Sequence, residues 1–177
     1  MKTLGRYAGA SLATAVGAAL AVLGPVQTAS AVTTYKVNNN CDYRSCAIGY
    51  SGRLFLYYNS KENDGYYSGL AHFYGNVYDY AGETVSPNGA IAVRYDFVFG
   101  KNNVGNTASG TGVAVKNNAA MVENCAPYDG YRVYYNSGYQ GSSQYFDHTY
   151  GSVNCAGGKS VNLNSTLKNN NASQHFA

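Results

Sequence analysis

A repeated segment is the feature that most constrains how this chain can fold. Residues 54–60 read Leu-Phe-Leu-Tyr-Tyr-Asn-Ser and residues 131–137 read Tyr-Arg-Val-Tyr-Tyr-Asn-Ser, so the last four positions are identical. Each copy is a run of strand-forming residues stopped by Asn-Ser, which predicts a strand followed by a turn. A second repeated pair, Lys116–Ala120 and Lys168–Ala172, lies closer together in the chain than the first pair does. The sequence therefore predicts two related β units, of which the first is the longer.

The extra residues of the longer unit are expected between Gly65 and Gly112. Within this stretch, apolar residues at every second position predict a strand, namely Ile91, Val93, Tyr95, Phe97 and Phe99. Residues 100–103 then indicate a turn. The segment 103–112 is rich in Gly, Asn, Ser and Thr, which predicts an exposed loop.

The composition favours an all-β fold. The chain has 19 Tyr and 21 Gly and is rich in Asn. Tyr suits half-buried pleated surfaces, while Asn and Gly supply turn positions with positive φ. Strong helix formers are sparse after residue 31. We expect a sandwich of two unequal Greek-key units, because neither unit alone could bury its apolar face.

The segment 1–31 has the order of a secretory signal peptide. Lys2 and Arg6 precede an apolar stretch, and Ala29-Ser30-Ala31 forms a small-residue cleavage signal. We therefore expect a single extracellular domain over 32–177, with a loose start, units at about 41–124 and 125–177, and no membrane association after cleavage. Without the leader, ten Lys and Arg face nine Asp and Glu and form no cluster of cations, which disfavours nucleic acid as a partner.

All four cysteines, Cys41, Cys46, Cys125 and Cys155, follow the leader. An even number in an exported chain predicts disulfides, and four cysteines allow three pairings. A zinc site would need paired Cys-x-x-Cys spacings, which are absent.

The sequence contains no recognisable catalytic motif and predicts a protein that is not an enzyme. Gly-x-Ser-x-Gly, His-Glu-x-x-His and Gly-rich phosphate loops are all absent. His72, His148 and His175 are far apart, and Asp147 and His148 are expected to point to opposite faces of a strand. The many tyrosines also suit a glycan-binding face, although the absence of Trp weakens that interpretation.

Several segments together resemble small secreted actinobacterial proteins grouped with the Streptomyces metalloproteinase inhibitor. They are the Cys-x₄-Cys segment before a Tyr-rich strand, Tyr135–Gly141, and the closing Lys-Asn-Asn-x-Ala-Ser. That family is similar in fold to the βγ-crystallins, which have an aromatic corner. Tyr139-Gln140-Gly141 of this chain matches that corner well, and Tyr67-Ser68-Gly69 matches it more loosely.

The resemblance implies a βγ-crystallin-like sandwich that inhibits an extracellular peptidase, above all a metallopeptidase. It also implies the disulfides Cys41–Cys46 and Cys125–Cys155. We expect the protein to be a monomer. The chain departs from the pattern of a short disulfide around an inhibitory loop, since Cys125 and Cys155 are far apart in sequence and enclose a whole strand-turn unit. No inhibitory bond can be carried over. The exposed candidates are the loop 100–112 and the segment 125–130.

Crystallin-type calcium sites resemble Asn/Asp-Asn/Asp-x-x-Ser/Thr-Ser. Residues 169–174 keep Asn169, Asn170 and Ser173 and lose the last serine, while residues 117–122 lose both hydroxyl positions. Neither copy has a carboxylate, so the alternatives are a weak calcium site and a plain turn. No other cofactor is expected. The alternative function is a structural or cell-wall-associated module with weak calcium or glycan binding.

Overall fold

The computed structural model describes residues 32–86, 89, 91–148, 155 and 159–177. Residues 1–31 lie outside the described residues, so the signal peptide stays a prediction. The described residues contain no α-helix, and two short 3₁₀ turns are described in full, η1 (Lys61–Asn63) and η2 (Gly65–Tyr67). The strands are β1 Thr33–Val37, β2 Arg53–Tyr57, β3 Leu70–Tyr74, β4 Gly82–Val85, β5 Val93–Phe97, β6 Met121–Asn124, β7 Tyr131–Asn136, β8 Gln140–Phe146, β9 Ser160–Asn162 and β10 Ser173–Phe176. The all-β prediction is confirmed.

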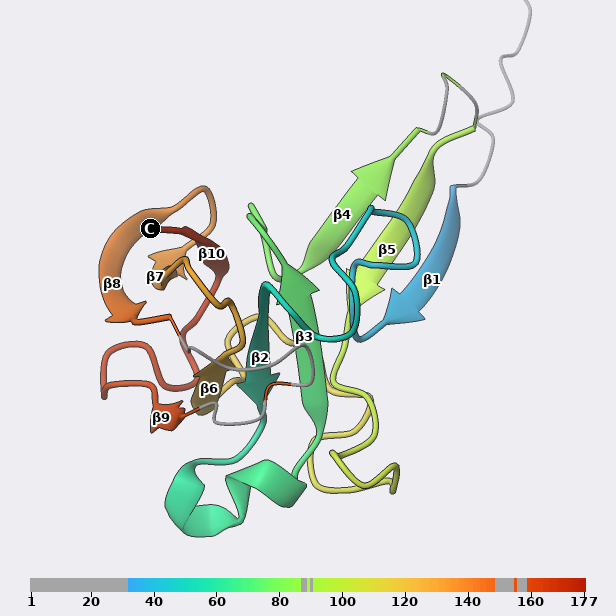
Figure 1. The fold of residues 1–177 in the computed structure, drawn as a ribbon. Coiled ribbons are helices and arrows are strands. Elements are labelled where there is room, and N and C mark those ends of the chain that lie inside the picture. The colour runs from blue at the N-terminus through green and yellow to red at the C-terminus, as the bar shows by residue number, and fades with distance from the viewer. Residues whose placement is uncertain (1–31, 87–88, 90, 149–154, 156–158) are drawn as a thin grey trace, which may run out of the picture. The chain divides into compact units, whose positions relative to one another are not determined.

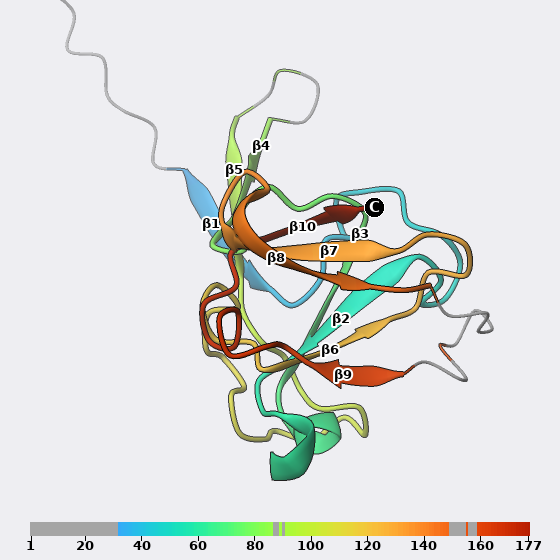
Figure 2. The same cartoon turned by 90° about the vertical axis from the view of Figure 1, so that its left-hand side faces the viewer.

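Two sheets form the sandwich, and each takes a segment from the other half of the chain. One sheet has the order β3-β2-β6-β9, in which β9 comes from the second half. The other has the order β10-β7-β8, and Val77 from the first half pairs with Gln174 of β10. Figure 2 shows β7, β8 and β10 lying over β2, β6 and β9. This exchange gives a sandwich of two unequal Greek-key units, as the sequence predicts.

The sequence repeat corresponds to equivalent places in the two sheets. β2 is flanked by β3 and β6, and β7 is flanked by β8 and β10. The Lys-Asn-Asn segments come directly before β6 and β10, and the first Asn of each adopts a left-handed conformation, with φ of 62° at Asn117 and 59° at Asn169. The chain therefore reaches the last strand of each unit through the same turn.

The core lies between the two sheets. Leu54 and Leu56 from β2 pack in one cluster with Tyr131 and Val133 from β7, and all four side chains are fully buried. Burying such a side chain contributes about 1.5–3 kcal/mol relative to leaving it in water. Because alternate residues of a strand face opposite sides, Phe55 and Tyr57 point to the outer face of their sheet.

A third sheet accounts for the longer first unit. β5 pairs with β4 in an antiparallel hairpin and with β1 in parallel (Figure 1). The strand predicted over Ile91–Phe99 is present but shorter, at Val93–Phe97. Ile91 is exposed, whereas Phe97 and Phe99 enter the core. The expected loose start of the domain is wrong, since Thr33–Val37 is already a paired strand.

The remaining fold predictions concern local features. Of Tyr139-Gln140-Gly141, Tyr139 ends the turn between β7 and β8 and the other two residues begin β8, with φ of 62° at Tyr139 and 78° at Gly141. The Tyr139 N–H donates to the Ser173 hydroxyl, which itself donates to the Asn136 carbonyl, so this serine ties the turn to β10. Within the described part of the chain, no helix has the length and apolarity needed to cross a bilayer.

Candidate functional site

The segment 125–130 lies between two buried strands and leaves the sheet for only a few residues. Cys125 and Ala126 are buried, Tyr128 is 84% exposed, and Gly130 is buried again where β7 begins. Pro127 has a fixed φ, which restricts the backbone just before the exposed residue. The segment therefore presents one aromatic side chain to solvent from a short, anchored loop.

A disulfide anchors one end of this loop. Cys125 is bonded to Cys155, with the Cα atoms 5.1 Å apart, and Cys41 is bonded to Cys46, with the Cα atoms 5.5 Å apart. Both predicted pairings are confirmed. Beside the first bridge, the Cys125 N–H donates to the Arg53 carbonyl at 2.8 Å and the Gly52 N–H donates to the Cys125 carbonyl at 3.1 Å. Two kinds of bond thus hold Cys125 in place.

The side chain of Asn124 holds the loop from inside. Its amide oxygen accepts the Ala126 N–H at 2.8 Å, and its amide nitrogen donates to the Asp129 carbonyl at 3.1 Å. The same nitrogen reaches the carbonyls of Phe146 at 3.2 Å and Asp147 at 2.9 Å. Since Asn124 is buried, these hydrogen bonds are shielded from water, and they join both arms of the loop to the end of β8.

The far end of the loop is packed against an aromatic ring. A side chain at Gly130 would overlap the ring of Tyr145, so only glycine lets that ring cover the chain here. The Gly130 carbonyl accepts the N–H of Ala177 at 2.9 Å. The next residue, Tyr131, is fully buried, and burial raises the pKa of its phenol. Its hydroxyl therefore stays protonated, donates to the Gly52 carbonyl at 2.6 Å and accepts the Gly75 N–H at 2.7 Å.

The other candidate, the loop 100–112, is exposed as predicted but is organised differently. The Asn102 side chain accepts the N–H groups of Val104 and Asn106, and its amide donates to the Tyr67 carbonyl. Val104 is 60% exposed at the tip. This loop rests on η2, and neither disulfide of the described residues includes any part of it. It therefore presents a small apolar side chain rather than an aromatic one.

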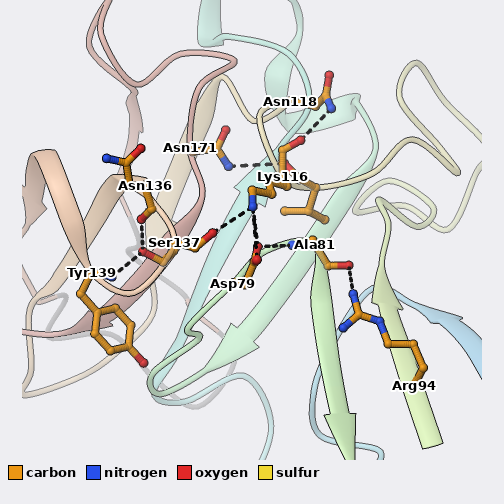
Figure 3. Close-up of polar contacts among 11 residues, drawn as sticks. Asp79, Ala81, Arg94, Lys116, Asn118, Asn136, Ser137, Tyr139 and Asn171 are labelled. Carbon is orange, nitrogen blue, oxygen red and sulfur yellow. Dashed lines mark hydrogen bonds and ion pairs between the residues drawn. The ribbon is translucent and has the colours of Figure 1, made fainter.

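The predicted calcium ligands do not share a cavity. Asn169 lines one of about 310 Å³ that also contains Lys168, whereas Asn170 lines another of about 210 Å³ beside Lys116. Ser173 is fully buried and lines neither, because its hydroxyl is used in the β7–β8 turn. Figure 3 shows the Lys116 ammonium directed at Asp79 and Ser137, at 3.0 Å and 2.9 Å. Calcium binding stays a prediction, although each cavity already contains a lysine.

One further cluster of metal-ligand residues occurs in the described part of the chain, formed by Glu123, Cys125 and Cys155. The two sulfur atoms are bonded to each other, so neither is a thiolate that could bind a metal. While the disulfide is intact, this cluster offers a single carboxylate. It is not a metal site in this state.

The expected geometry of Asp147 and His148 is wrong. β8 ends at Phe146, so these residues are not in a strand, and the Asp147 carboxylate lies 2.9 Å from Nδ1 of His148. His72 lies in β3 and His175 in β10, in different sheets. The histidines are thus dispersed, as expected, and the Asp147 side chain is 74% exposed.

Sequence reasoning missed Asn124. The only available signal was an asparagine at the end of an apolar run, followed by Cys-Ala-Pro, and Asn at such a position often bonds the backbone two residues on. That rule accounts for the bond to Ala126. It could not indicate the bonds to Asp129, Phe146 and Asp147, which depend on the packing of β8 against β7.

The comparisons with known proteins concern the fold alone. No protein-family model matches the chain, and no curated protein is similar to it, so the resemblance to the inhibitor family has no support from them. A solved structure described as "Evolution of the eye lens beta-gamma-crystallin domain fold" is similar over 75% of this chain and 91% of that chain, with 13% sequence identity and a TM-score of 0.43. The fold class stated above rests on the strand pairings themselves.

Proposed function

We propose that this protein is a secreted, non-catalytic inhibitor of an extracellular peptidase and that residues 125–130 are its inhibitory loop. One observation carries the proposal, the 84% exposure of Tyr128 on a backbone fixed at both ends. Peptidases bind a short stretch of chain with one side chain inserted into a pocket. The geometry of this loop supports that kind of contact better than loop 100–112 does.

The physical reason is the conformational entropy of binding. Ordering a loop on docking costs free energy, so a loop that is already ordered binds more tightly for the same contacts. Asn124 and the Cys125–Cys155 bridge supply that order before the peptidase arrives. They would also hold the two arms together after a cut, which would slow release and favour resealing of the peptide bond. In this proposal the buried amide of Asn124 takes the place of a short disulfide around the loop 125–130, which that loop lacks.

The class of peptidase comes from the sequence resemblance. An aromatic side chain suits enzymes whose pocket accepts large apolar residues, which includes thermolysin-type metallopeptidases and some subtilisin-type serine peptidases. The two disulfides suit an oxidising compartment, where such enzymes act. In this account the protein acts by binding, and none of its own groups takes part in peptide cleavage.

The test is an inhibition assay with three purified forms of the protein. Residual activity of a thermolysin-type and a subtilisin-type peptidase is measured with a several-fold molar excess of wild type, Tyr128→Ala or Val104→Ala. We expect wild type to inhibit the metallopeptidase and Tyr128→Ala to weaken inhibition by about thirtyfold or more, as for an interface residue that dominates binding. Val104→Ala is the control, because it changes the tip of the other loop.

Both substitutions are at exposed positions, so each should change the free energy of unfolding by less than about 0.5 kcal/mol. Inhibition lost in Val104→Ala but kept in Tyr128→Ala would assign the activity to loop 100–112. Inhibition of neither enzyme by wild type would contradict the proposal and favour the alternative of a structural or wall-associated module.

A further inference from the structure

A cavity of about 360 Å³ opens on the outer face of the β3-β2-β6-β9 sheet, the face turned away from the main core. Strand register brings its floor together. Phe55 of β2 is opposite His72 of β3 on one side and Glu123 of β6 on the other. Tyr57 lies two residues along the same face. The volume is in the range of about 300–1,000 Å³ that is usual for small-molecule sites.

Aromatic rings form most of the apolar lining. The Phe55 ring stacks on His72 with centroids 5.2 Å apart, and the Tyr57 ring stacks on Tyr66 at 6.2 Å. Tyr50 packs edge-on against Phe55 at 5.2 Å. Tyr50 and Tyr66 are about half exposed, so both rings stand at the rim with a free side. A ligand entering here would meet several π faces at once.

The polar centre of the cavity is the carboxylate of Glu123. Its side chain is buried, with 8% exposure of the residue, and the Tyr57 hydroxyl donates to it at 2.8 Å. Burial and the Glu123 charge both raise the pKa of Tyr57, so this hydroxyl stays protonated and remains a donor. The Ser160 hydroxyl is more distant, at 3.4 Å. The Cys155 sulfur lies 3.6 Å away, but it has no proton to donate, because it belongs to a disulfide.

Among the described residues, Glu123 makes no ion pair with a cationic side chain. A buried carboxylate is costly unless a positive charge compensates it, and acidic residues are seldom buried without one. Arg53 is directed elsewhere, to Nδ1 of His72 at 3.1 Å and over the Tyr50 ring. The charge of Glu123 is thus available to a ligand.

We propose that this pocket binds a ligand with a single protonated amine on a compact hydroxylated body, the chemistry of an amino sugar. The ammonium group contacts Glu123, and the face of Tyr66 attracts the same charge through its π system. The amides of Asn38, Asn102 and Asn103 line the cavity and suit ligand hydroxyls. Lys101 also lines it, which disfavours a second cationic group on the ligand.

The site is suited to binding and not to glycoside hydrolysis. Glycosidases of the usual kind place two carboxyl groups across the bond that they cleave. Glu123 is the single carboxylate among the described residues that line this cavity. The pocket is also formed from other residues than loop 125–130, so this proposal stands or falls independently of peptidase inhibition.

The test is an NMR titration of the ¹⁵N-labelled protein at a pH of about 6, where an amine is protonated. The probes are D-glucosamine, N-acetyl-D-glucosamine and D-glucose, which share a sugar ring and differ in the amine, together with tetramethylammonium. We expect glucosamine to shift the amide signals of Phe55, Tyr57 and Glu123 in a saturable way. Glucose and the acetylated sugar should bind at least about tenfold more weakly, the difference made by one charge-assisted contact.

Two variants locate the site. Glu123→Gln keeps the size of the side chain and should weaken glucosamine binding by about tenfold. Tyr66→Ala should also weaken it, whereas Tyr67→Ala is the matched control, since Tyr67 is similarly exposed and does not line the cavity. If Glu123→Gln does not fold, Tyr66→Ala and Tyr67→Ala alone decide.

Saturable binding of glucosamine that is weaker in Tyr66→Ala but not in Tyr67→Ala, and weaker in Glu123→Gln if that variant folds, supports the proposal. Competition between tetramethylammonium and glucosamine would support the proposal further, because it would show that a cation without hydroxyl groups binds at the aromatic rings of the pocket. Equal binding of all three sugars would overturn it in favour of a neutral glycan site. Absence of binding by every probe, or shifts that are unchanged in Tyr66→Ala, would overturn it outright.

Discussion

The backbone N–H of Asn117 donates to the carbonyl of Asn171 at 2.7 Å, and the N–H of Asn169 donates in return to the carbonyl of Ala119 at 2.9 Å. The two repeated segments therefore pair with each other across the approximate symmetry of the units. Their side chains differ at one position, where the second copy has Asn171 and the first has Ala119. Asn171 accepts the N–H of Ala119 at 3.0 Å and donates to the Val115 carbonyl at 3.4 Å.

Replacing Asn171 by Ala should therefore loosen the contact between the units. The substitution leaves the N–H of Ala119 buried without that acceptor, and such a loss costs about 1–3 kcal/mol. Asn170→Ala is the control in the same turn, because Asn170 is exposed and its side chain bonds only the neighbouring Lys168 carbonyl. Its effect should be within about 0.5 kcal/mol. Urea unfolding of both variants decides, and equal midpoints would show that the paired turns contribute nothing specific.

His72 predicts a pH dependence of stability. Burial, assisted by the charge of Arg53, lowers the pKa of His72 from 6.5 to about 4. Between these values the unfolded chain binds a proton that the folded chain excludes. The contribution of neutral His72 is complete above about pH 6.5 and is lost as the pH falls toward 4.

The measurement is the urea midpoint of unfolding between pH 7 and 4, for wild type and His72→Gln. The loss of stability over this range should be smaller in His72→Gln than in wild type. Parallel curves for the two proteins would mean that His72 contributes nothing to the fall.

The calcium prediction can be tested by melting temperature. Since Ser173 is occupied in the turn and the cavities of Asn169 and Asn170 each contain a lysine, we expect no change in melting temperature between millimolar calcium and a chelator. Magnesium at the same ionic strength is the control for general salt effects. A saturable rise with calcium, abolished in Asn169→Ala, would establish the weak site that the sequence motif suggests.

Much of the fold was predictable because its determinants are local. The identical Tyr-Tyr-Asn-Ser segments correspond to β2 and β7, and the Lys-Asn-Asn segments form the same turn before β6 and β10. The strand Thr33–Val37 was missed because its residues are mostly exposed and show no apolar alternation. It is a strand because it pairs with β5, which lies far along the chain, and no local pattern reveals such a partner.

The candidate sites likewise include features that depend on local sequence and features that depend on strand pairing. The sequence alone nominates the segment 125–130, because its Pro, Asp and Gly predict an exposed loop, and Tyr128 and Asp129 are exposed. The hydrogen bonds of Asn124 to the end of β8 and the pocket around Glu123 depend on strand register. Phe55, His72 and Glu123 come from three strands, and only the pairing of β2 with β3 and β6 places them side by side.

The central claim is that a peptidase contacts residues 125–130. Hydrogen–deuterium exchange of the protein alone and in complex with a metallopeptidase that it inhibits tests this most directly, because it measures the exchange of the backbone amides in every segment at once. The account predicts that exchange slows at Tyr128, Asp129 and their neighbours in the complex and is unchanged at Val104 and the rest of loop 100–112. Protection confined to loop 100–112, or no protection at 125–130 while the enzyme is inhibited, would contradict it.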